Sequence, residues 1–262
     1  MVLKIGTRKS PLAMAQAYEV KKMVASHNIQ NGNPTKIKLI GLKTTGDRFL
    51  DRPLSELGGK GAFTKELDEA LLDFRIDLAV HSMKDVPTYL PEDISLPCML
   101  ERSDVRDAMI SSQFNSFSQI PKGGSVGTAS MRRQSQILNK YPDLRVTLLR
   151  GNIETRLKKL REGEVDATIL AVAGLKRLGY TNSITSILEP EELLPAVGQG
   201  AIGVTCRTRD PDMINLLSYI NHKSTFTCVN AERAMLMALD GSCRSPIGGL
   251  STLDESKENI NI

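Results

Sequence analysis

Two segments of the chain share one pattern, in which a short apolar run is followed by a Gly-Thr turn and then by a serine that precedes a helix. The first copy has its apolar run at 2–5 and its turn at 6–10, and the second has Val126 and a turn at 127–130. Apolar runs that alternate with amphipathic helices are typical of α/β sheets, which bind ligands at the carboxyl ends of their strands. The repeat therefore predicts two α/β units built on one plan.

The rest of the chain supplies the other elements of these two units. Ser10 and Pro11 form a helix start, because serine caps a helix and proline fits its first position. Apolar runs predict strands at 36–39, 78–80, 94–100, 146–149, 167–172 and 201–206. We expect the last of these strands to return to the first unit. Helical spacing predicts helices after Pro11, over 63–74 with an apolar face of Phe63, Leu67, Leu71 and Phe74, up to about 139, after Asn152, and over 211–220 and 224–239.

Basic residues stand at the strand ends of both units. Two of them, Arg132 and Arg133, fall in a first helical turn, where cations oppose the helix dipole unless an anion binds them. Arginine binds carboxylates with two hydrogen bonds, and the set is too large for one phosphate. We therefore expect a ligand with several carboxylates. The set is Arg8, Lys84, Arg132, Arg133, Arg150, Arg156 and Arg177.

The stretch 77–87, DLAVHSMKDVP, places polar side chains directly after an apolar strand. These are His81, Ser82, Lys84 and Asp85. An acid beside a base at a strand end can set opposite charges against one substrate. Charged turn residues are also common, so a solvated Lys84–Asp85 pair is an alternative that the spacing leaves open.

Three loops carry further signals. The glycines around Lys60, in 57–63, predict either a loop that approaches a ligand or a flexible connector. The run 101–107 is charged without periodicity, which indicates a hinge between the units. The segment 197–200, in which glycines bracket Gln199, is expected to cross between the units.

The composition excludes several function classes. A net charge of +4, 4% aromatic residues and the lack of Trp argue against nucleic-acid binding. No apolar run is long enough to span a membrane. The first residues lack the apolar region of a signal peptide, so we expect a cytoplasmic protein.

The four cysteines show neither zinc nor disulfide spacing. Cys98, Cys206 and Cys228 lie in apolar patterns and are expected to be packed in the core. Cys243 lies on a loop rich in Gly and Pro, beside Arg244, which favours its thiolate. It is a candidate nucleophile, although a single loop thiol is also compatible with a bystander.

Several long motifs carry a resemblance to a known family. They are TRKSPLA at 7–13, GGKG at 58–61, VHSMKDVP at 80–87, RGN at 150–152, LAVAGLKRL at 170–178, PAVGQG at 195–200, GSC at 241–243 and PIG at 246–248. With these motifs the chain resembles the porphobilinogen deaminases, also called hydroxymethylbilane synthases, over nearly its whole length.

The resemblance implies two α/β domains like those of solute-binding proteins, joined by a hinge, with a small and incomplete α+β third domain. Domain 1 would comprise 1–100 and 197–220. Domain 2 would be 101–196, with its hinge at 101–107. A partial third domain at 221–262 would carry the loop to which a cofactor is attached.

The resemblance also implies a reaction of haem biosynthesis. Porphobilinogen, a pyrrole that bears acetate, propionate and aminomethyl groups, loses ammonia and joins a growing chain four times, and water then releases hydroxymethylbilane. The chain grows on a dipyrromethane cofactor that a thioether joins to Cys243. Asp85 is expected to be catalytic, because a carboxylate can stabilise the cationic azafulvene, bind pyrrole N–H groups and relay the proton of the leaving amine.

The site residues follow from the same resemblance. Those expected to bind the cofactor are Cys243, Lys84, Asp85, Ser130, Arg132 and Arg133. Those expected to bind the substrate are Arg8, Ser10, Lys60, Phe63, Ser82, Thr128, Arg150, Asn152, Arg156, Arg177 and Gln199. No metal, nucleic acid or membrane is expected as a partner, and the protein is expected to be a monomer.

The family's chains continue past the point where this one ends, and 221–262 is short for a self-sufficient core. We therefore expect the chain to hold its cofactor poorly and its activity to be impaired. A non-enzymatic binder of acidic solutes on the same two domains is the main alternative. A phosphate-binding enzyme is a further one, although the chain has no Walker or dinucleotide fingerprint.

Overall fold

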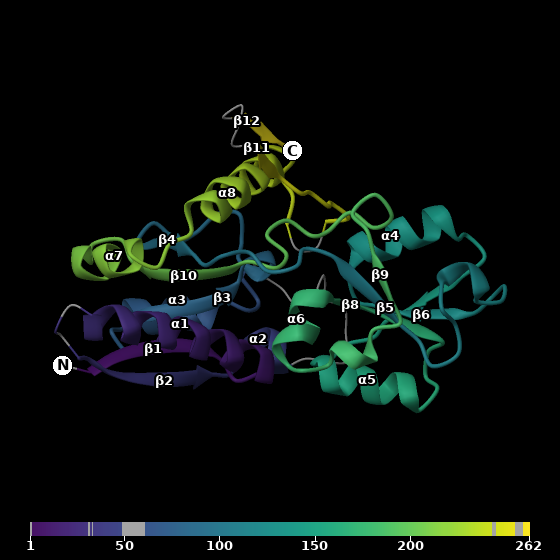
Figure 1. Cartoon of the computed structure of the whole chain (residues 1–262), viewed down its shortest axis with the longest axis horizontal. Helices are drawn as coiled ribbons and strands as arrows, with labels where there is room; N and C mark the ends of the chain where they lie inside the picture. The colour runs from purple at the N-terminus through teal and green to yellow at the C-terminus, as the bar shows by residue number, and fades with distance from the viewer. Residues whose placement is uncertain (1, 31, 33, 49–60, 243–244, 255–258) are drawn as a thin grey trace.

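Two α/β units, each built on a five-stranded sheet, form most of the chain, and a helix with a two-stranded hairpin forms a smaller third part (Figure 1). The structure is a computed structural model that describes residues 2–30, 32, 34–48, 61–242, 245–254 and 259–262. The two sheets lie side by side along the long axis of the molecule. The predicted class, two α/β units with a small third part, is confirmed.

The first sheet has the strand order β2-β1-β3-β10-β4. In it β1 is parallel to β2 and β3, whereas β10 is antiparallel to both of its neighbours. The predicted return of the chain to the first unit is therefore confirmed. The strands are β1 (Val2–Arg8), β2 (Lys36–Leu42), β3 (Leu78–Ser82), β4 (Ile94–Met99) and β10 (Ile202–Arg207).

Helices cover both faces of the first sheet. The first begins at Pro11, as predicted, and buries Val20 and Val24 completely against the sheet. Each valine contributes about 1.5–3 kcal/mol by this burial. The opposite face packs against Leu67 and Leu71. The helices of this unit are α1 (Pro11–Gln30), α2 (Thr45–Arg48), α3 (Lys65–Leu72) and α7 (Pro211–Ser218).

Two details of this unit differ from the sequence prediction. α1 extends to Gln30, although the polar residues at 28–34 are typical of a turn. Phe74 lies beyond the end of α3 with a φ of 58°, and it is 68% exposed. The prediction that Phe74 belongs to the apolar helix face is therefore wrong. Instead, the Arg207 guanidinium lies 4.6 Å from the centre of its ring.

The second sheet has the order β7-β6-β8-β5-β9. Successive residues of β8 face opposite cores, with Ile169 near α4 and Leu170 near α5 and α6. Its strands are β5 (Asp107–Ile110), β6 (Ser125–Gly127), β7 (Arg145–Thr147), β8 (Ala167–Ala171) and β9 (Ser186–Leu188). Its helices are α4 (Met131–Lys140), α5 (Ile153–Arg161) and α6 (Val172–Arg177).

Two segments connect the sheets, at 100–106 and at 189–201. They coincide with the predicted hinge and crossing, although the predicted domain boundaries themselves stay a prediction. The third part contains α8 (Lys223–Ala238) and the hairpin of β11 (Thr252–Asp254) and β12 (Asn259–Asn261). Short 3₁₀ turns lie at Met83–Asp85, Phe117–Gln119 and Thr181–Ser183. The predicted burial of Cys98, Cys206 and Cys228 is confirmed.

Candidate functional site

A cavity of about 640 Å³ lies between the two sheets. Its wall is formed by the turn after β3, the starts of α1, α4 and α5, the crossing at 196–201 and part of α8. All seven cations selected from the sequence line this cavity, and so does Asp85. The strand-end pattern therefore identifies one continuous charged wall.

The turn after β3 brings Lys84 and Asp85 to this wall. Asp85 Oδ2 lies 3.6 Å from Arg8 Nη1. Lys84 Nζ donates to Gln199 Oε1 at 3.4 Å. Burial, followed by the nearby charge of Arg133, lowers the pKa of Lys84 to about 8. The pair is thus part of the cavity and not an exposed turn.

Arg8 already has a carboxylate partner, Asp47. Its Nη2 and Nε atoms both donate to that carboxylate, and Thr44 Oγ1 donates to it at 2.7 Å. Burial disfavours the charge of Asp47, but the hydrogen bonds and charge of Arg8 and the hydrogen bonds from Thr44 together outweigh it and lower the pKa of Asp47. The Arg8 guanidinium also lies 4.1 Å from the centre of the Phe63 ring, a cation–π contact.

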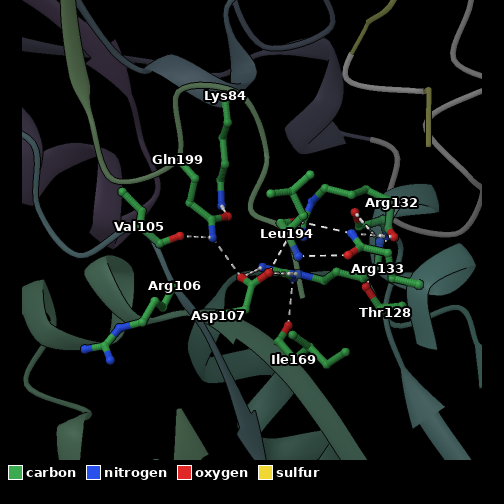
Figure 2. A network of polar contacts seen from close by, with 12 residues as sticks. Lys84, Val105, Arg106, Asp107, Thr128, Arg132, Arg133, Ile169, Leu194 and Gln199 are labelled. Atoms are coloured by element: carbon green, nitrogen blue, oxygen red, sulfur yellow. Dashed lines mark hydrogen bonds and ion pairs between the residues drawn. The ribbon is translucent and has the colours of Figure 1, made fainter. Parts of the chain in front are cut away.

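Arg132 and Arg133 are bound to Asp107, which is fully buried at the start of β5 (Figure 2). Asp107 accepts Arg132 Nη2 at 2.7 Å and Arg133 Nη2 at 2.6 Å. Arg133 Nη1 donates to the Ile169 carbonyl at 2.7 Å. Burial opposes the charge of Asp107, but the two arginines hold its pKa well below the usual range. The anion that the sequence predicts for this helix start is therefore an internal carboxylate.

Gln199 connects the two walls of the cavity. Its Nε2 atom donates to Asp107 Oδ1 at 3.0 Å and to the Val105 carbonyl at 2.8 Å. Because its Oε1 atom accepts from Lys84, the side chain lies between a residue of the first unit and one of the second. Figure 2 shows this chain of contacts from Lys84 to the two arginines.

Arg150 and Arg156 surround the start of α5, which Asn152 caps by accepting the Thr155 N–H at 2.8 Å. Arg150 Nη2 donates to the Gly46 carbonyl at 3.3 Å, across the cavity. Arg156 Nε donates to the Gly151 carbonyl at 2.9 Å. Burial, with the charges of Arg133 and Arg150, lowers the pKa of Arg156 to about 10. Arg156 forms no ion pair with any carboxylate in the part of the chain that the structure describes.

Arg177 lies at the end of a helix rather than of a strand. It is the last residue of α6, and its Nε atom donates to Glu19 Oε2 of α1 at 3.0 Å. This contact joins the two units at the edge of the cavity. The residue thus lines the predicted site but has a carboxylate partner within the chain.

The predicted hydroxyl residues have mainly local contacts. Ser130 caps α4 by accepting the Arg133 N–H, and Ser10 accepts the Ala13 N–H. Ser82 is hydrogen-bonded to the Gln16 side chain at 2.9 Å. Ser10, Ser82 and Ser130 line the cavity. Thr128 is buried and does not line the cavity. Its hydroxyl accepts the Ser130 N–H at 3.1 Å.

Two predicted residues, Lys60 and Cys243, lie outside the described residues. Within the described ranges, no group of His, Cys, Asp or Glu side chains could hold a metal ion. No helix in the same ranges has the length and apolar character needed to cross a membrane.

The acids that pair with the cavity arginines were not predicted from the sequence. These are Asp47, Asp107 and Glu19. Asp107 is the last residue of the charged run at 101–107, which indicated a hinge. Its one available signal was its position immediately before the apolar run of β5, which suggests the start of a strand.

Two family models match the chain. "Porphobilinogen deaminase, dipyromethane cofactor binding domain" matches residues 3–215, and "Porphobilinogen deaminase, C-terminal domain" matches 226–262.

Curated relatives cover nearly the same range. A chloroplastic porphobilinogen deaminase of Oryza sativa subsp. japonica is 54% identical over 254 residues, which is 97% of this chain and 71% of the relative. The porphobilinogen deaminase of Nitrobacter winogradskyi is 54% identical over 94% of this chain and 77% of its own length. That of Paracoccus denitrificans is 49% identical over 96% and 80%.

A solved lipoprotein of Bacillus subtilis, assigned to methionine binding, has a similar fold. Its TM-score is 0.51 at 13% identity, over 84% of this chain and 90% of that one. At this identity the likeness concerns the fold alone.

Proposed function

The chain belongs to the porphobilinogen deaminase family, and from that premise we propose that Asp85 is its catalytic carboxylate. The enzyme condenses porphobilinogen head to tail in tetrapyrrole synthesis and uses a dipyrromethane cofactor. One observation carries the proposal: Asp85 lies on the wall that also carries the seven cations selected from the sequence, with the Arg8 guanidinium 3.6 Å away.

The reaction of the substrate needs a carboxylate at this position. Loss of ammonia from the aminomethyl group leaves a cation on the pyrrole, and a nearby negative charge stabilises that cation more than the neutral substrate. Asp85 can also accept the pyrrole N–H and hold the proton that the leaving amine needs. The cations around it bind the acetate and propionate groups and keep the reacting carbon near Asp85.

The cavity wall fits the acidic cofactor. Lys84, Arg132 and Arg133 surround a single buried carboxylate, Asp107, so positive charge is in excess there. Carboxylates of a dipyrromethane would balance this excess. When bound, the cofactor supplies the primer to which porphobilinogen is joined. The residues that we propose to hold it are Lys84, Asp85, Ser130, Arg132 and Arg133, with a thioether to Cys243.

The substrate-binding residues remain proposals of the same kind. Arg156 is the best supported, because it is half-buried, lines the cavity and has no carboxylate partner among the described residues. Arg8 and Arg177 must exchange Asp47 and Glu19 for a substrate carboxylate. The remaining lining residues of the set are Ser10, Phe63, Ser82, Arg150, Asn152 and Gln199. Thr128 would act only through Ser130, and Lys60 is proposed from the sequence alone.

The variant Asp85→Asn tests the catalytic role, because it keeps the shape of the side chain and removes its charge. We expect porphobilinogen consumption and ammonia release to fall about 10²–10⁴-fold. Glu154→Gln is a matched control, since Glu154 also lines the cavity but is exposed on α5. Turnover by Asp85→Asn equal to that of the control would refute the proposal.

Intact mass tests the attachment of the cofactor. We expect the part of the purified chain that holds the cofactor to carry the mass of two linked pyrroles, and Cys243→Ala to lack this adduct. Cys228→Ala is the control, because that thiol is buried in α8. An adduct that persists in Cys243→Ala would contradict the thioether.

The cytoplasmic location, the monomeric state and the domain boundaries are further proposals from the sequence. The rice relative is described as chloroplastic, which concerns that protein. Cell fractionation, light scattering, and limited proteolysis at 101–107 would test the three in turn.

A further inference from the structure

Helix α8 carries two adjacent charged residues, Glu232 and Arg233, that are both buried. Neither belongs to the site predicted from the sequence. Adjacent residues of a helix point about 100° apart, so one helix can contact two different segments with them.

Glu232 binds both segments that cross between the sheets. Its carboxylate forms an ion pair with Arg102, at the start of the first crossing. It accepts the Gly198 N–H of the second crossing at 2.7 Å and the Ser251 N–H at 2.8 Å. Because its side chain is fully buried, Glu232 ties α8 firmly to the connection between the two units.

Arg233 binds the backbone directly after Asp85. Its Nη1 atom donates to the Val86 carbonyl at 3.2 Å, and its Nη2 atom donates to the carbonyls of Pro87 at 2.7 Å and Thr88 at 3.2 Å. The residue is 9% exposed and borders the cavity. Within the described residues Arg233 has no carboxylate partner, so these three successive carbonyls are the acceptors that bind its guanidinium group.

The beginning of the same turn is held by other contacts. Met83 N–H donates to the Ala201 carbonyl at 3.0 Å, and Val86 N–H donates to the Met83 carbonyl at 3.1 Å. The first bond fixes the backbone before Asp85, the second closes the turn across Asp85, and the bonds from Arg233 fix the backbone after Asp85. The turn is therefore held from both sides, and the second side depends on α8.

We propose that Arg233 is a positioning residue for Asp85, and that Glu232 couples this positioning to the two crossing segments. The proposal rests on the catalytic role of Asp85 proposed above. Arg233 acts through the backbone of the turn, so it changes where the carboxylate stands and not how tightly the substrate carboxylates are bound. Through these contacts α8 links the two crossing segments to the turn that carries Asp85.

The variant Arg233→Met tests this role, because it keeps much of the side-chain volume and removes every donor. We expect kcat to fall about ten- to a hundredfold, since small displacements of a reacting group cost rates of this size. KM should change by less than about twofold, because ground-state binding is untouched. Arg233→Lys should recover part of kcat, since an ammonium group still donates to carbonyls.

Arg207 provides the matched control. Its Nη1 atom donates to the carbonyls of Leu71 and Ile76 at 2.9 Å each, and it does not line the cavity. Arg207→Met should lower the urea midpoint while kcat stays within about twofold of the parent. If Arg233→Met loses kcat only in proportion to its loss of folded protein, Arg233 is purely structural and the proposal is overturned. Should Arg233→Met fail to fold, Arg233→Lys serves in the same comparison.

A double-mutant cycle separates the two proposals. If Arg233 acts through Asp85, Arg233→Met should cost little further turnover in the Asp85→Asn background. Losses that multiply would overturn the positioning role and leave the role of Asp85 intact. Retained turnover in Asp85→Asn alone would contradict the proposed function, and the positioning role with it.

Discussion

Arg132 and Arg133 at the start of α4, and Arg156 in the first turn of α5, look alike in the sequence but have different surroundings in the structure. The first two share the buried carboxylate of Asp107. Arg156 has only the Gly151 carbonyl as its hydrogen-bond acceptor in the described part of the chain, and its pKa is lowered to about 10 by burial and by neighbouring cations. In one cluster a shared buried carboxylate offsets part of the positive charge, and in the other no carboxylate of the described chain does so.

The difference shows that cations of one cavity wall can have separate tasks. Where a buried acid completes an arginine pair, loss of the acid should affect folding first. Where no acid is present, loss of the arginine should affect ligand binding first. Four measurements test this division, beginning with the one for which we expect the largest effect.

Asp107→Asn should destabilise the fold by about 3–5 kcal/mol, because it leaves two buried guanidinium groups without an anion. Urea unfolding measures this loss. Asp104→Asn is the control: Asp104 also binds two cations, but the side chains of Arg106 and Lys176 are 30% and 48% exposed. There we expect a loss of about 1 kcal/mol or less. Equal losses would remove the distinction between the clusters.

Arg156→Met should mainly weaken substrate binding. A lost charge-assisted hydrogen bond of about 1.5–3 kcal/mol corresponds to a rise in KM of about ten- to a hundredfold. The free energy of unfolding should stay constant or rise, because a desolvated cation without a carboxylate partner is removed. A large loss of stability with an unchanged KM would place Arg156 in the same class as Arg132.

Lys84 extends the comparison to the opposite wall of the cavity. Its pKa in the folded protein, about 8, is lower than the ordinary 10.5. Between these values the unfolded chain binds more protons, so the stability of the folded state should rise with pH across this window. Lys84→Met should lack this rise, which urea unfolding at several alkaline pH values measures. An identical pH slope in both proteins would show that Lys84 keeps its ordinary pKa.

Glu19→Gln should have the smallest effect. Glu19 is 43% exposed where it meets Arg177, so its loss should cost about 1 kcal/mol or less. Because Arg177 is then free for a substrate carboxylate, KM should fall slightly or stay constant. A rise in KM would show that Glu19 itself helps to form the binding site.

Local sequence patterns predicted the helices and strands that have a clear start signal or a regular spacing of apolar residues. Ser10 and Pro11 predicted the start of α1, and the apolar run before His81 predicted β3, which the turn with Lys84 and Asp85 follows. The cations could be grouped because the carboxyl ends of parallel strands meet at one edge of a sheet. That rule works without knowledge of any individual contact.

The acids that partner these cations could not be found in the same way. Asp107 lies 25 residues before Arg132 and 26 before Arg133, and it closes a charged run that has the composition of a linker. Its burial depends on the way in which α4 packs on the second sheet, which no local pattern reports. Phe74 was misplaced for a related reason, since the helical spacing continues past the residue at which α3 ends.

The insertion of β10 between β3 and β4 has a consequence for the way in which the protein is made. Among the strands that the structure describes, β10 is the single neighbour of β4 in the first sheet, and β10 is synthesised after the whole second sheet. As the chain leaves the ribosome, the N–H and C=O groups of β4 cannot form their strand pairing until residues 202–207 have been synthesised. The second sheet, continuous from 107 to 188, can close while the first is still open. Folding during translation should therefore finish with the N-terminal sheet, the reverse of the usual order in which N-terminal domains fold first.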